Sequence, residues 1–153
     1  MAKRFLVWAF VLASCTYSFV QTSLPRGNAV WVEQFENSTG FYGIENVFFT
    51  ALVSALEEGG QFVVKKKAPY VISGELLEFS DEPKVYTATG VVERYEVKIK
   101  AMIEWRDVVA DSVIYEGTVE GAGVYSEGED RMKGIEIAVN EMIRKIVSGV
   151  LVE

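Results

Sequence analysis

The sequence contains few residues that could do chemistry together. Its only cysteine is Cys15, and none of its 153 residues is histidine. The lack of histidine excludes Ser-His-Asp triads, histidine metal ligands and the commonest general base near neutral pH. Acidic residues cluster at positions 57–58, 81–82 and 127–130, each at an expected helix end or loop. We interpret these clusters as solvated charge, and we expect a protein that is not an enzyme, with no catalytic residue, metal site or cofactor.

Cys15 follows a short hydrophobic segment. Lys3 and Arg4 form a basic start, and residues 5–13 are apolar. This segment is too short for a membrane-spanning helix, which needs roughly 20 apolar residues, and its pattern is typical of a secretory signal peptide. The four residues from Leu12 to Cys15 read Leu-Ala-Ser-Cys. They resemble the lipobox of bacterial lipoproteins at every position.

The lipobox resemblance implies that residues 1–14 are a signal peptide that is cleaved before Cys15. It also implies diacylglycerol on the Cys15 sulfur and a third acyl chain on the new amine, which together anchor a protein firmly. Thr16 follows Cys15 in place of aspartate, and by the lipoprotein sorting rule this implies the outer membrane. The alternative is a plain signal peptide with an unrelated cysteine, which would leave an unpaired thiol in an oxidising compartment.

The charge of the chain bears on its partners. Loss of Lys3 and Arg4 with the signal peptide would change the net charge from −7 to −9. Because an acidic domain binds nucleic acid poorly, we expect no nucleic-acid partner. Three consecutive lysines at positions 65–67 are an exception to this acidity. They form either a solvated turn, which we favour, or a binding patch.

Residues 91–105 predict a long strand with two different faces. The residues of the apolar face are Tyr95, Val97, Ile99, Ala101, Ile103 and Trp105. Glu96, Lys98, Lys100 and Glu104 alternate with them on the other face, where Met102 is the exception. Because side chains of a strand point to opposite faces in turn, this pattern predicts one buried face and one face open to water or a partner.

The remaining elements complete an α+β domain over residues 29–153, preceded by a lipidated linker at residues 15–28. We expect strands at residues 29–36, 70–79 and 112–123, and a loop or hairpin tip at residues 80–90. One-sided apolar stripes predict helices from about residue 43 to 58 and from about 130 to 150. The expected fold is a two-layer sandwich of order β-α-β-β-β-α. Its four-stranded mixed sheet has a parallel first pair, an antiparallel meander and both helices on one face.

Several local matches together resemble the LptE lipopolysaccharide-assembly lipoproteins of Gram-negative bacteria. They are Cys15 with Tyr17 and Phe19, the segment Phe35-Glu36-Asn37-Ser38-Thr39, Gly43-Ile44-Glu45, residues 70–74, and Tyr86, Gly90 and Glu93-Arg94-Tyr95. Pro69 departs from the family pattern, which has aspartate at that point. The resemblance implies a non-enzymatic plug of the outer-membrane β-barrel LptD that helps to assemble and insert lipopolysaccharide. It also implies attachment to the membrane through the lipid anchor on the periplasmic side.

Two other functions stay open. One is a different periplasmic lipoprotein adaptor, such as an activator of a cell-wall synthase, and the other is a periplasmic enzyme. Candidate contacts with lipopolysaccharide or the barrel are Lys84 and Arg94 near the expected hairpin tip, and Lys98 and Lys100 on the charged face. Arginine suits phosphate through its planar fork and lysine acts as a point charge. The alternative is that these cations are ordinary solubilising surface residues.

Overall fold

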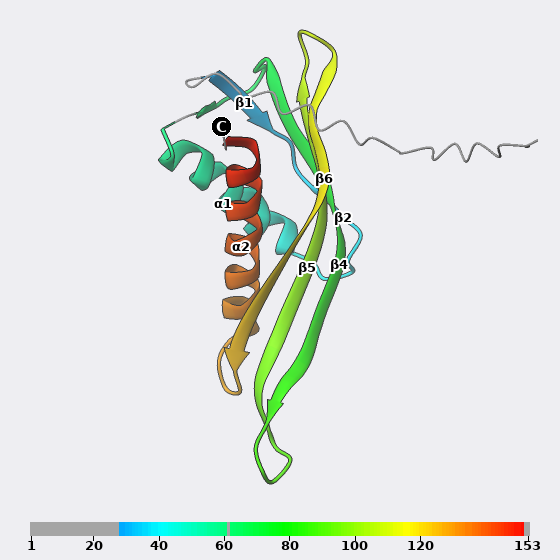
Figure 1. The fold of residues 1–153 in the computed structure, drawn as a ribbon, viewed down its shortest axis with the longest axis vertical. Coiled ribbons are helices and arrows are strands. Elements are labelled where there is room, and N and C mark those ends of the chain that lie inside the picture. The colour runs from blue at the N-terminus through cyan, green and yellow to red at the C-terminus, as the bar shows by residue number, and fades with distance from the viewer. Residues whose placement is uncertain (1–27, 61, 152–153) are drawn as a thin grey trace, which may run out of the picture.

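A computed structural model describes residues 28–60 and 62–151. The elements in chain order are β1 (Asn28–Val32), β2 (Glu36–Asn37), α1 (Ile44–Glu58), β3 (Phe62–Val64), β4 (Tyr70–Tyr86), β5 (Val92–Asp107), β6 (Ser112–Ser126) and α2 (Arg131–Leu151). Both helices lie on one side of a single mixed sheet (Figure 1). This confirms the predicted α+β class and the predicted placement of the helices. No helix in the described part of the chain is long and apolar enough to cross a membrane.

The sheet has six strands and not the four that we expected. Its order is β3-β1-β4-β5-β6, with β2 also paired to β4. β1 is parallel to β4, as predicted, while β4, β5 and β6 form the predicted antiparallel meander. The additional strands β2 and β3 have only two and three residues, so their sequences carry too little periodicity to predict them.

The predicted first strand, residues 29–36, is divided into β1 and β2. Both parts pair with β4, but Val32 is opposite Ile72 and Glu36 is opposite Glu75, so the first strand contains one extra residue. Within this interruption Phe35 turns into the core and is only 2% exposed. Gly74 makes room for it, because a Cβ atom there would lie 2.6 Å from the Phe35 ring.

The prediction of a loop at residues 80–90 is wrong for residues 80–86, which belong to β4. β4 continues to Tyr86, and the turn to β5 begins at Thr87. Asp81 and Pro83 are residue types that favour loops, but both lie within the strand. β1 and β2 pair with β4 no further than Leu76, so beyond that point β4 has an open edge where Pro83 interrupts no ladder. The Asp81 carboxylate accepts hydrogen bonds from the Tyr125 hydroxyl at 2.9 Å and pairs with Arg131 at 2.7 Å.

The core lies between the helices and the inner face of the sheet. The predicted apolar face of β5 is buried from Val97 to Trp105, while Tyr95 is half-buried against the Tyr125 ring. α2 lies directly on β6 at two glycines. A Cβ atom at Gly121 or Gly123 would approach the carbonyl oxygen of Ala138 or Gly134 to about 2 Å. This close contact leaves the opposite face of β4, β5 and β6 without cover from either helix (Figure 1).

Candidate functional site

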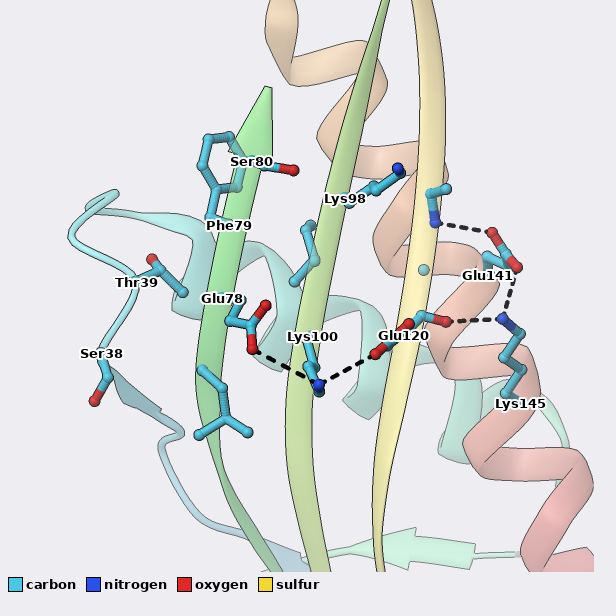
Figure 2. Close-up of a pocket in the computed structure, with 14 residues that line it drawn as sticks. Ser38, Thr39, Glu78, Phe79, Ser80, Lys98, Lys100, Glu120, Glu141 and Lys145 are labelled. Atoms are coloured by element: carbon cyan, nitrogen blue, oxygen red, sulfur yellow. Dashed lines mark hydrogen bonds and ion pairs between the residues drawn. The ribbon is translucent and has the colours of Figure 1, made fainter. Parts of the chain in front are cut away.

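The uncovered side of β4, β5 and β6, which we call the outer face, carries the predicted charged residues of β5. Cross-strand register sets their neighbours: Lys100 is opposite Glu78 on β4 and Glu120 on β6. The Lys100 ammonium lies 3.6 Å from the Glu78 carboxylate and 3.3 Å from the Glu120 carboxylate (Figure 2). These carboxylates, Glu120 foremost, raise the pKa of Lys100. The positive charge of Lys100 is therefore balanced by carboxylates of the two neighbouring strands.

A second charge group surrounds Glu96. Its carboxylate pairs with the ammonium groups of Lys84 and Lys98, the latter at 3.3 Å. Hydrogen bonding to Lys84, and then to Lys98, lowers the pKa of Glu96. Lys84 reaches this face because it is the extra residue of a β-bulge between Pro83 and Val85. Bulges redirect a side chain in this way.

Further along β5 the outer face is balanced in the same manner. The Arg106 guanidinium donates to the Glu104 carboxylate at 3.1 Å and lies 3.5 Å from Asp111. Met102, at the middle of the face, is 40% exposed. Cations and carboxylates thus alternate over the outer face, which is suited to a polar partner surface or to water and does not form a concentrated site for an anion.

An open depression of about 580 Å³ runs across the outer face. Its walls are Ser38 and Thr39 after β2 on one side, and Glu141 and Lys145 of α2 on the other (Figure 2). Its floor combines the charged side chains of Glu78, Lys98, Lys100 and Glu120 with apolar and small residues, whereas pockets for small molecules are mostly apolar. Among the described residues, no group of three or more aspartate, glutamate, histidine or cysteine side chains could hold a metal ion.

The free edge of β6 is closed by α2 beside this depression. The Glu141 carboxylate accepts the Ala122 amide at 2.9 Å, and the Lys145 ammonium donates to the Glu120 carbonyl at 2.8 Å. The two side chains also pair with each other at 2.7 Å. Hydrogen bonding to Lys145, and then to the Ala122 amide, lowers the pKa of Glu141. These contacts occupy backbone groups that could otherwise pair with another strand.

The model of the LptE family, described as lipopolysaccharide-assembly, matches residues 27–150. The chain belongs to the LptE family. A search of curated proteins found no match. The family match confirms the resemblance derived from the sequence, and it assigns the domain to lipopolysaccharide assembly.

Solved structures share the fold at low sequence identity. Hypothetical protein CT253 from Chlamydia trachomatis is 12% identical with a TM-score of 0.61, covering 82% of this chain and 96% of its own. The PelC dodecamer from Paraburkholderia phytofirmans is 20% identical with a TM-score of 0.58, covering 84% and 92%. A putative lipoprotein from Caulobacter crescentus CB15 is 16% identical with a TM-score of 0.54, covering 77% and 88%. At these identities the likeness is one of fold.

The predicted contact residues all lie on the outer face, but in different surroundings. Lys84, Lys98 and Lys100 are ion-paired, and Lys84 lies within β4 and not in the expected loop. Arg94 lies within β5, opposite Val85 and Ser126, and is exposed. Within residues 28–60 and 62–151, no carboxylate forms an ion pair with it. Cys15 is outside the described residues.

Sequence reasoning missed the counterions Glu78 and Glu120 and the role of Glu141 and Lys145 at the β6 edge. Counting back from the pair of Tyr86 and Val92 would have placed Glu78 opposite Lys100, because the two register shifts between these pairs offset each other. Our assignment of residues 80–90 to a loop hid that register. The Glu141–Lys145 spacing was visible as a helical i, i+4 pair, but nothing in the sequence shows which strand edge it meets.

Proposed function

We propose that this protein is an outer-membrane lipoprotein that plugs an LptD-type β-barrel and takes part in lipopolysaccharide transport and insertion. It is held on the periplasmic side by lipid on Cys15 and acts by binding and not by catalysis. The observation that carries the proposal is the outer face, where three long strands display balanced charge with no helix over them. A barrel lumen is polar, so a plug needs a charged surface that stays soluble and still matches polar walls.

Affinity purification from detergent-solubilised outer membranes tests the partner. We expect a large β-barrel protein to purify with the wild-type chain. Lys100→Glu would place three carboxylates together with Glu78 and Glu120, and we expect it to reduce the amount of barrel protein recovered. Lys133→Glu is a matched control, because Lys133 also pairs with a carboxylate but lies on α2 away from the outer face. Recovery of a peptidoglycan synthase in place of a barrel would contradict the proposal.

The anchor is tested at Cys15 itself. Cys15→Ala should block processing of the precursor and release the protein from membranes. Intact-mass measurement of the native protein should show cleavage before Cys15 and added acyl chains. A native protein with an unmodified Cys15 would rule out the anchor.

Contact with lipopolysaccharide is proposed for Arg94 with Lys84 beside it. Arg94 is the predicted cation without a paired carboxylate in the described part of the chain, and its planar fork matches a phosphate. Lys84→Glu combined with Arg94→Glu should weaken lipopolysaccharide binding by the purified protein. The fold should persist, because surface changes usually cost less than about 0.5 kcal/mol. Arg144→Glu, on the exposed side of α2, is the control, and equal binding by both variants would count against this contact.

A further inference from the structure

One end of the sheet gathers features that the outer face does not explain. The β5–β6 turn, the segment between β3 and β4 and the start of β1 lie together at the upper end, and the β4–β5 turn lies at the other (Figure 1). Strand register aligns the three upper segments with one another, because Val30 is opposite Tyr70, and Tyr70 is opposite Asp107. The Val108 amide donates to the Pro69 carbonyl at 2.8 Å, which ties the β5–β6 turn to the segment before β4.

The β5–β6 turn is apolar and exposed. Val108 is 54% exposed, Val109 82% and nearby Val113 42%. The turn is already ordered, because the Asp107 carboxylate accepts the amides of Val109 and Ala110 at 2.9 Å. An ordered turn that holds two valines in water has no explanation in the packing of the core.

The three lysines at positions 65–67 are exposed at the same end. The Lys65 amide donates to the Val30 carbonyl at 2.9 Å, and the Lys66 ammonium lies 5.9 Å from the centre of the Trp31 ring. No carboxylate of the described residues forms an ion pair with any of the three. The carboxylates of the β5–β6 turn are engaged, since Asp107 holds the turn and Asp111 pairs with Arg106.

β1, the first described element, also begins at this end. β1 begins at Asn28, thirteen residues after Cys15. Thirteen residues reach at most roughly 45 Å when fully extended, and about 20 Å as a flexible coil. A lipid anchor at Cys15 would therefore keep the β5–β6 turn and residues 65–67 within reach of the membrane.

We propose that this end of the molecule rests on the membrane that holds the anchor. In this arrangement Val108 and Val109 enter the interface between headgroups and acyl chains, and residues 65–67 lie against anionic phospholipid headgroups. Exposed apolar side chains beside basic residues are the combination that binds a lipid interface. Each lysine near an anionic surface strengthens such binding roughly fivefold. The inference rests on the lipid anchor given under Proposed function.

Spin labelling of the full mature lipoprotein tests the contact. Val109→Cys and, at the opposite turn, Ala88→Cys each provide one labelling site, because Cys15 is acylated in this account. The labelled proteins are reconstituted into vesicles rich in phosphatidylglycerol and, separately, into phosphatidylcholine vesicles. We expect the label at position 109 to collide more with oxygen than with a water-soluble nickel complex, and the label at position 88 to show the reverse.

The second part of the experiment tests the lysines at positions 65–67. The label at position 109 should lie deeper in phosphatidylglycerol vesicles than in phosphatidylcholine vesicles. Replacement of all three lysines by glutamine should remove that difference. Protein that floats with the vesicles but keeps both labels equally accessible to nickel overturns the contact and leaves the anchor intact. Protein that does not float with either kind of vesicle overturns both the contact and the anchor.

Discussion

Neighbouring side chains on β5 have opposite surroundings. Ile99 is 1% exposed, whereas 61% of the Lys98 side chain is exposed. Ile99→Ala should therefore lower the free energy of unfolding by about 2–5 kcal/mol, because it leaves a cavity in the core. Lys98→Ala should lower it by less than about 0.5 kcal/mol. Urea denaturation measures both, and an equal loss for the two variants would mean that the faces of β5 are assigned the wrong way round.

Glu96 gives the outer face a dependence on pH. Lys84 and Lys98 lower its pKa below the ordinary value of 4.5, so the folded protein binds this proton less readily than the unfolded chain does. The resulting stabilisation is complete above about pH 4.5 and is lost as the pH falls through the folded pKa. Glu96→Gln should cost less than about 1 kcal/mol at neutral pH, since the side chains of Lys84 and Lys98 are 47% and 61% exposed and solvent screens their charges.

Denaturation of wild type and Glu96→Gln across this pH range checks the assignment. The difference between their free energies of unfolding should shrink towards zero in acid. A difference that stays constant from neutral to acidic pH would show that Glu96 stabilises the fold by packing and not by its charge.

At the scale of elements, β6 is an edge strand that α2 closes with two side chains. Glu141→Ala combined with Lys145→Ala should free the Ala122 amide and the Glu120 carbonyl, since both are held only by these side chains at that edge. We expect faster hydrogen exchange at the Ala122 amide and more self-association in light scattering, because an open edge pairs with other strands. Glu136→Ala, at an exposed position of the same helix, should change neither. Unchanged exchange in the double variant would refute the edge-closing role.

Elements long enough to show a repeating apolar pattern were predictable from the sequence, and short or irregular elements were not. The stripes of α1 and α2 and the alternation of β5 specify two layers, because each leaves one apolar face to bury. The bulges at Leu77 and Lys84 and the two short strands depend on partners that are distant in the sequence. The same holds for the contact of α2 with Gly121 and Gly123, since a glycine in a strand does not show which backbone approaches it.

The candidate site was likewise predictable only in part. Lys98 and Lys100 were placed on the outer face by alternation alone, and the structure has them there. Their counterions come from β4 and β6, so the charge balance of the face depends on tertiary register. Sequence reasoning could therefore find the face but not show that its cations are neutralised.

The whole molecule is a sheet with one face buried, one face charged and its two hairpin turns at opposite ends (Figure 1). This arrangement assigns a separate task to each region in our account. The helices stabilise the fold, the outer face is the surface proposed to meet the barrel, and the end where β1 begins is the end proposed to lie at the membrane.

Site-specific photocrosslinking in living cells tests the central claim, that the outer face meets an LptD-type barrel. Met102 on the outer face and Ile137 on α2 are matched positions, 40% and 41% exposed. A photoreactive amino acid at position 102 should crosslink to the barrel protein, and the same residue at position 137 should do so at much lower yield. Crosslinking to the barrel from position 137 alone, or to a peptidoglycan synthase from position 102, would contradict the account.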